Sequence, residues 1–429
     1  MNGPRYFTSC DWKTAGIVFG IALAIYGATV APAVTLEYSG ALVVAADHLG
    51  VARPPGYPVW TLLAKAFIGL FPFAQYHGHP NPAWAVNLMS AVFGAGACSL
   101  LAGLACRLAR EIVPDARGAT VSGIVAGLLL AFSPVLWSQA VIAETHTLTN
   151  FYFLSLLVLS LRWMSIADGH PPFLLAFLAG LGLCISPLLI LYLPVLLLAA
   201  ALVSRKSFAH LSAAALLFCG FLFAEFRWGS LRPALGGAGL GLALGVAGGL
   251  AAHRATRPVA GLLLLLLAGL IPYVYLPLAS GHNPPMNMGH ARTWEGFWHV
   301  VRRGQYEALV PLNPFAEPLA FARALAWYAR LVAAQFTAPL ATLALVPALA
   351  LPRLNRRAQA SILLVLAAFF CFAVVTLVGT HPLLDIQNTW VARTIFLPSF
   401  ALVALLIGAG WAILGRWIVG QSMRNPPAP

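Results

Sequence analysis

The stretch TLEYSGALVVAADHLGVARPPGYPVW, residues 35–60, concentrates polar side chains in a chain of which only 9% is charged. Its first carboxylate, Glu37, lies just beyond a long apolar segment, 14–34. A carboxylate at such a boundary is partly desolvated, which suits a general base that takes a proton from a hydroxyl group. Glu37 is therefore a candidate catalytic base. An interfacial loop with incidental charges remains the alternative.

The rest of this stretch supplies groups that would position a substrate. The segment SGALVVAADHLG predicts a short amphipathic helix, because Leu42, Val43, Ala46 and Leu49 recur at helical spacing. The prolines of RPPGYP then predict a stiff turn, since each proline fixes φ. The substrate-binding residues predicted here are Asp47, His48, Arg53 and Tyr57.

A second polar group, SQAVIAETH at residues 138–146, lies between two apolar segments. Glu144 is an acid near the expected bilayer boundary, where ionisable residues are rare and commonly functional. Gln139 and Glu144 are therefore candidate substrate-binding residues. A solvated hairpin is the alternative.

Arginines stand beside aromatic residues in two later segments. The loop 280–330 opens with a Pro-Pro turn and predicts a helix at 293–304 that contains Trp294 and ends at Arg302 and Arg303. Arg393 lies just before the last apolar segment. Guanidinium groups bind phosphate through paired hydrogen bonds, so these residues are predicted to bind an anionic headgroup such as a lipid phosphate. Ordinary attraction to lipid headgroups is the alternative.

Histidines raise the alternative of a metal site. Asp47, His48, His77 and His79 carry suitable ligand atoms. However, His77 and His79 lack the i, i+4 spacing of a helical metal site, and they lie in a loop rich in glycine and proline. No metal site is predicted.

The composition indicates what kind of protein must position these residues. The chain has 429 residues, of which 60% are hydrophobic, whereas soluble domains are about 45–50% apolar. This predicts an all-α polytopic membrane protein with about 12 transmembrane helices (range about 11–13), folded as a single membrane domain, 1–429. The predicted spans are 14–34, 83–106, 118–137, 146–164, 172–186, 187–204, 207–226, 233–252, 258–279, 331–352, 359–379 and 395–415.

Charge predicts the orientation of these spans. The net charge of +13 is attributed to arginines in short cytoplasmic loops, and no nucleic acid is expected as a partner. Both termini are then cytoplasmic. The loops 35–82, with its interfacial helices, and 280–330 are extracytoplasmic and helical. The abundance of alanine and arginine, with little lysine, is typical of a GC-rich bacterium and indicates the bacterial inner (plasma) membrane.

One apolar stretch, 57–73, is not counted as a span. Lys65 at its centre would cost about 2.5–3.5 kcal/mol on insertion scales. The stretch is predicted to be a helix at the outer interface, with Lys65 reaching toward the headgroups.

Three blocks of sequence resemble a family of multi-span proteins first catalogued as a membrane domain of unknown function. The blocks are LGVARPPGYP at 49–58, WSQAVIAE at 137–144, and Asn283-Pro284-Pro285 followed by Thr293-Trp294 and Gln305-Tyr306. The family includes an animal protein O-mannosyltransferase and belongs to the GT-C glycosyltransferases. The likeness covers about residues 30–310, and it adds Asn283, Gln305 and Tyr306 to the substrate-binding residues.

This chain departs from the family pattern at its acidic pair. Family members usually read Gly-Asp-Ser-Gly-Glu-Leu where this chain reads Glu37-Tyr38-Ser39-Gly40-Ala41-Leu42. The usual acids therefore fall on Tyr38 and Ala41, and the usual histidine before Pro-Pro falls on Arg53. Only Glu37 supplies a carboxylate in this motif.

The resemblance implies a glycosyltransferase that moves mannose or another hexose from a polyprenyl-phosphate donor to an extracytoplasmic hydroxyl, with inversion and without a metal or other cofactor. The implied partners are membrane lipids, the polyprenyl-phosphate-linked sugar, and a protein, lipid or glycan acceptor. Two other functions stay open: a transporter or flippase, and a non-catalytic scaffold that lost the acidic pair. Few Asp or Glu residues lie within the apolar segments, which weighs against an ion-coupled carrier.

Overall fold

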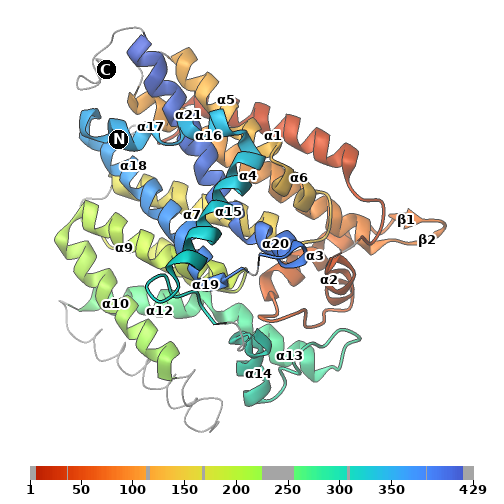
Figure 1. Ribbon diagram of the computed structural model, residues 1–429. Coiled ribbons are helices and arrows are strands. Elements are labelled where there is room, and N and C mark those ends of the chain that lie inside the picture. The colour runs from red at the N-terminus through yellow and green to blue at the C-terminus, as the bar shows by residue number, and fades with distance from the viewer. Residues whose placement is uncertain are drawn as a thin grey trace.

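The computed structural model describes residues 6–35, 37–112, 116–166, 170–224, 256–306, 310–382 and 384–418. These segments form a bundle of helices with one small β-hairpin (Figure 1). This agrees with the predicted all-α membrane fold. The predicted span 233–252 lies outside the described residues.

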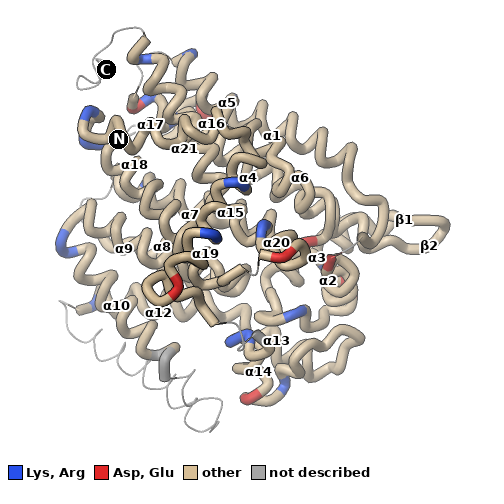
Figure 2. Tube along the Cα trace, in the orientation of Figure 1, with Lys and Arg blue, Asp and Glu red and all other residues tan. Residues whose placement is uncertain are grey.

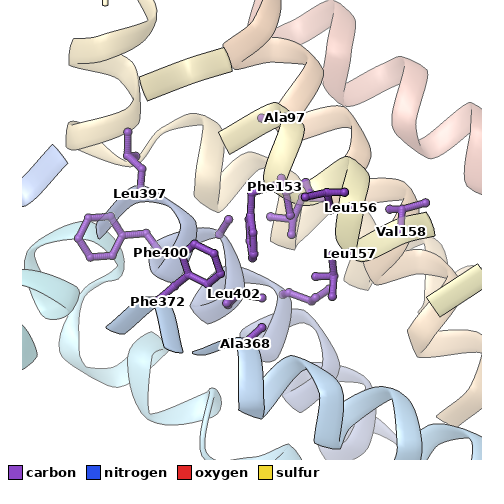
Figure 3. Packing of buried hydrophobic residues seen from close by; sticks show 14 of the residues in the cluster. Ala97, Phe153, Leu156, Leu157, Val158, Ala368, Phe372, Leu397, Phe400 and Leu402 are labelled. Carbon is purple, nitrogen blue, oxygen red and sulfur yellow. The ribbon is translucent and has the colours of Figure 1, made fainter. Parts of the chain in front are cut away.

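Five helices form the centre of the bundle. They are α1 (Ser9–Thr29), α4 (Pro82–Ile112), α5 (Ala116–Ala131), α7 (His146–Ile166) and α21 (Leu397–Ile418). Small residues let these helices approach closely, as is common between helices in membranes. A Cβ atom on Gly127 of α5 would lie 2.7 Å from the Cβ of Ala102 on α4. Elsewhere large side chains fill the space: Figure 3 shows Phe153 against Phe372, whose ring centroids are 4.5 Å apart.

The remaining helices surround this centre. On one side are α8 (Phe173–Leu183), η1 (Pro187–Leu191), α9 (Tyr192–Val203), α10 (Arg205–Ala224), α12 (Arg257–Gly269), η3 (Ile271–Val274) and α13 (Tyr275–Gly281). The C-terminal part contains α15 (Pro318–Phe336), α16 (Ala338–Leu343), α17 (Val346–Ala350), η5 (Leu351–Arg353), α18 (Arg356–Phe369), η6 (Phe370–Val375), α19 (Thr376–Thr380), α20 (Ile386–Ala392) and η7 (Arg393–Phe396).

The number of spans differs from the prediction. Within the described residues, six helices are long and apolar enough to cross a membrane, or up to eight if each bent pair counts as one span. The predicted twelve are not confirmed. One reason is proline: Pro134 starts a new helix, α6 (Pro134–Ala140), at 66° to α5, because proline cannot continue the hydrogen bonding of the preceding helix. The apolar helices Phe173–Leu183 and Pro187–Val203 are also short.

The shorter elements gather at one end of the bundle, called the site end below (lower right in Figure 1). They are α2 (Ser39–Asp47), α3 (Pro58–Leu70), β1 (Gln75–Tyr76), β2 (His79–Pro80), α6, α13, α14 (Trp294–Val301) and η4 (Gly304–Tyr306). The helices predicted at 39–50 and 293–304 are confirmed as α2 and α14, each a few residues shorter. Leu49 lies beyond α2 and is 41% exposed, so it does not join the buried face that was predicted for it.

Lys65 has a partner within the protein that the sequence analysis did not predict. Its Nζ donates a hydrogen bond to the backbone oxygen of Asp47 and lies 3.2 Å from the Asp47 carboxylate. Lys65 therefore joins α3 to the C-terminus of α2, where a cation also stabilises the exposed carbonyl groups of the helix end.

Two segments far apart in the sequence pair beside α13. Val51 N–H donates to Met286 O (2.8 Å), and Met288 N–H donates to Val51 O (3.0 Å). The turn that follows brings Gly56 so close to α13 that a Cβ atom there would lie 2.6 Å from Leu276 Cδ2. Gly56 also has φ +89°, a conformation that favours glycine. Glycine is therefore the residue that this turn requires.

We expect Gly56→Ala to lower the free energy of unfolding by about 1–3 kcal/mol, since it adds both a strained backbone and a contact with Leu276. Thermal unfolding in detergent measures the change. Gly16→Ala is the matched control, because a Cβ atom at this helical glycine would meet no atom within 4 Å. Equal melting temperatures for the two variants would contradict the expectation.

Candidate functional site

Glu37 lies in an exposed turn at the start of α2 and has φ +66°. The extended chain before it is held by Asn87 of α4, whose Nδ2 donates to Ala31 O (2.9 Å) and Ala33 O (3.1 Å). Gln139 of α6 approaches the carboxylate from the other side, with 3.5 Å between its Nε2 and Glu37 Oε2. The Glu37 carboxylate is thus held in place at one edge and open at the other.

Glu144 lies in the buried loop between α6 and α7, and only 2% of its side chain is exposed. Its Oε2 lies 3.2 Å from Arg53 and accepts a hydrogen bond from Thr145 N–H (3.2 Å). Burial raises the pKa of Glu144 above its ordinary value; Arg53 counteracts this shift, and the nearby charge of Glu37 adds to it. Glu37 and Glu144 are therefore close enough to interact, but they lie in very different surroundings.

Aromatic rings hold Arg53 in place. Its guanidinium carbon lies 4.3 Å from the centre of the Tyr38 ring and 5.9 Å from that of Tyr57. Cation–π contacts of this kind are favourable. The stiff turn at residues 54–58 thus directs one arginine between two rings and toward Glu144.

Two residues that the sequence analysis did not select, His146 and Thr394, extend this cluster to the C-terminal helices. His146 Nε2 lies 4.0 Å from Glu144 Oε2 and 3.1 Å from Thr394 Oγ1. Arg393, next to Thr394, stacks on Trp390 at 3.2 Å and interacts electrostatically with Glu37. The only indication in the sequence that His146 belongs to the site was its position two residues after Glu144. A single histidine at the start of a helix is weak evidence for such a role.

A second group of predicted residues lines a cavity of about 620 Å³ between α8, α10, α12, η3 and α14. Its walls are mainly apolar, and Arg292, Arg302 and Arg303 lie along it. Trp294 also lines the cavity, and within the described part of the chain its buried indole N–H has no hydrogen-bond partner. Figure 2 shows basic and acidic segments around α13 and α14, and further acidic and basic segments around α2, α3 and α20.

The two groups are neighbours. Tyr57, which contacts Arg53, lies close to Tyr273, which lines the cavity. The pairing of residues 51 and 286–288 also connects the loop of Arg53 to the segment that precedes α14. The apolar walls and the arginines of the cavity suit an elongated molecule with an apolar tail and an anionic head.

The other predicted site residues lie elsewhere. Asp47 pairs with Lys65, and His48 is exposed at the end of α2. Asn283 and Gln305 are exposed, and Tyr306 lies in η4. Among the residues that the structure describes, no three His, Cys, Asp or Glu side chains lie together in a way that could hold a metal ion.

The fold and the site define a multi-pass helical membrane protein with a polar cluster and an apolar, arginine-lined cavity at one end. Residues 39–209 match the family described as the protein O-mannosyl-transferase TMEM260 N-terminal domain. The predicted resemblance to an O-mannosyltransferase-like membrane family is confirmed for this region. It contains the first two sequence blocks, whereas the third, at 283–306, lies beyond it.

Two relatives show the extent of the similarity. Protein O-mannosyl-transferase TMEM260 of Mus musculus is 33% identical over 191 residues, which cover 42% of this chain and 25% of the mouse protein. Its Dictyostelium discoideum counterpart is 26% identical over 142 residues, which cover 33% of this chain and 16% of that protein. The alignments thus span a quarter or less of these relatives. No solved structure matches the chain significantly.

Removing Arg53 should show how much the buried Glu144 carboxylate lowers the free energy of unfolding when it has no cation beside it. We expect Arg53→Met to lower the free energy of unfolding by about 3–5 kcal/mol near neutral pH, because Glu144 is left buried without its cation. Since burial raises the pKa of Glu144, the loss should be largest at high pH and should fade as the pH falls below the ordinary carboxyl pKa, where Glu144 is protonated in both states.

Thermal unfolding at acidic and alkaline pH measures this effect, and two further variants control it. Adding Glu144→Gln to Arg53→Met should recover much of the loss. Lys65→Met, which breaks a half-exposed pair, should cost at most about 1 kcal/mol. If Arg53→Met and Lys65→Met lower the free energy of unfolding equally, the ion pair of Arg53 does not behave as a buried pair.

Proposed function

We propose that this protein is a GT-C-type glycosyltransferase. It moves mannose or another hexose from a polyprenyl-phosphate donor to a hydroxyl group of an extracytoplasmic acceptor, with inversion at the sugar. The names of the relatives, protein O-mannosyl-transferases, support sugar transfer and favour a protein acceptor. We further propose the bacterial inner membrane as its location, with both termini cytoplasmic and the site end facing outward.

The observation that carries the proposal is the contrast between the two acids. Glu37 is exposed and open to an incoming hydroxyl group, whereas Glu144 is buried and bound to Arg53. A base must reach its substrate, and a buried acid held by a cation serves better to hold its neighbours in place. Glu37 thus supplies the carboxylate that the family motif usually has at the positions of Tyr38 and Ala41.

In the reaction, the Glu37 carboxylate takes the proton of the acceptor hydroxyl group. The hydroxyl oxygen attacks the anomeric carbon and forms the new glycosidic bond, while the bond from that carbon to the phosphate oxygen breaks. The electron pair of the broken bond leaves with the lipid phosphate. Help from a general base accounts for a factor of about 10²–10⁴ in rate.

The arginine-lined cavity suits the lipid donor. Its apolar walls fit a polyprenyl chain, and Arg302 and Arg303 can stabilise the negative charge that develops on the departing phosphate. Because arginines supply this charge, the proposed reaction needs no metal. A chelator should accordingly leave the rate unchanged.

We expect Glu37→Gln to lower the rate of sugar transfer by about 10²–10⁴ without changing the amount of folded protein. The assay measures transfer from a polyprenyl-phosphate hexose to acceptor by the purified full chain. Glu317→Gln, an exposed acid outside both groups, is the control. If Glu37→Gln transfers sugar at an unchanged rate, Glu144 or Asp47 is the base instead. No transfer by the unmodified chain would favour the transporter or the scaffold.

We expect the double variant Arg302→Gln/Arg303→Gln to lower kcat/KM for the donor by about a hundredfold or more, since each lost hydrogen bond to a charged group is worth about 1.5–3 kcal/mol. Steady-state kinetics with varied donor test this. Arg162→Gln, an exposed arginine on α7, should leave kcat/KM unchanged. A drop in kcat with an unaltered KM would exclude a role in donor binding.

A further inference from the structure

The helix α15 lies across the bundle instead of along it. The axis of α15 turns by 106° to reach the segment Ala338–Arg353, and Figure 1 shows α15 running across the direction of α18 and α21. Its contacts lie at the site end: Tyr328 OH donates to Ser399 Oγ (2.8 Å) near the start of α21, and Gln335 Oε1 accepts from Val135 N–H (3.0 Å) near the start of α6. α15 therefore connects the start of α21 to α6, which belongs to the site end.

One face of α15 is packed against the bundle. Tyr328 lies against Phe396 and Phe400 of the C-terminal helices, with ring centroids 5.1 Å and 6.4 Å apart. Ala324 and Phe336 are also buried. This face alone secures the helix, so the opposite face is free to contact the surroundings.

The opposite face combines apolar and basic side chains. Leu319, on the same side of the helix as the two arginines, is 64% exposed. Leu325, on another side of the helix, is 36% exposed, and Arg323 and Arg330 are exposed as well. The two arginines are seven positions apart, so they lie on one side of the helix at a separation of about 10 Å. Among the described residues no acidic side chain forms an ion pair with either, and Arg330 Nε donates a hydrogen bond within its own helix to Ala326 O (3.3 Å).

We propose that α15 lies in the plane of the bilayer interface at the site end, and that Arg323 and Arg330 bind the phosphates of anionic phospholipids there. Exposed leucines beside exposed arginines are the pattern of a helix that lies in the interface, with its apolar side chains among the acyl chains. Phosphate complements the charge of the two guanidinium groups, which bind it in a bidentate manner. These arginines are separate from those that line the donor cavity.

The test uses the purified full chain in nanodiscs of phosphatidylcholine, alone or with added phosphatidylglycerol, and measures bound lipid by native mass spectrometry. Each arginine near a charged surface contributes about a fivefold gain in affinity, so Arg323→Gln/Arg330→Gln should lower phosphatidylglycerol binding by about thirtyfold. The control Arg205→Gln/Arg356→Gln removes the same charge from two exposed sites elsewhere. It should change binding only slightly.

Three outcomes would overturn the proposal. One is an equal loss in the control, which would indicate general charge attraction. Another is no preference of the unmodified chain for phosphatidylglycerol. The third is that Arg323→Gln/Arg330→Gln lowers the binding of polyprenyl phosphate but not that of phosphatidylglycerol. This result would assign the face to the donor. Lipid binding is measured without sugar transfer, so this test of α15 is independent of the proposed function.

Discussion

The ion pair between Arg53 and Glu144 is the interaction on which the candidate site depends. The two residues are 91 positions apart, and their side chains are only 14% and 2% exposed. A carboxylate buried this deeply is costly unless a cation and hydrogen bonds compensate it. The pair therefore ties the loop before α3 to the loop between α6 and α7. It does so next to Trp60, whose indole N–H donates to the backbone oxygen of Glu144 (3.2 Å).

This constraint separates the two acids of the cluster into different roles. Glu144 is occupied by Arg53 and by backbone N–H groups, so it organises its surroundings. Glu37 keeps one side open because Asn87 and Gln139 hold only the chain before it and one edge of its carboxylate. The polar cluster also continues into the C-terminal helices through His146 and Thr394. Residues outside the family match thus take part in the same site.

Several features could be predicted from sequence because they depend on local order. The α2 and α14 helices follow from apolar spacing, and the need for a rigid turn at 54–58 follows from its prolines. The predictions were incomplete where a distant partner decided the outcome. Lys65 was assigned to the headgroups because its own helix is apolar, but Asp47, 18 positions away, binds it. The predicted spans 118–137 and 331–352 are interrupted at Pro134 and at Thr337, where a helix bends sharply within an apolar stretch.

By itself, the sequence determined that the protein is a helical membrane protein, and it determined which short stretches carry acids and arginines. Both follow from hydrophobicity and residue type along the chain, which need no knowledge of partners. Only the tertiary structure decided which acid is buried and which is open, that Arg53 lies between Tyr38 and Tyr57, and that Arg302 and Arg303 share a cavity with α8 and α12. Desolvation and charge pairing set the chemistry of these groups, and both depend on contacts between residues far apart in the chain.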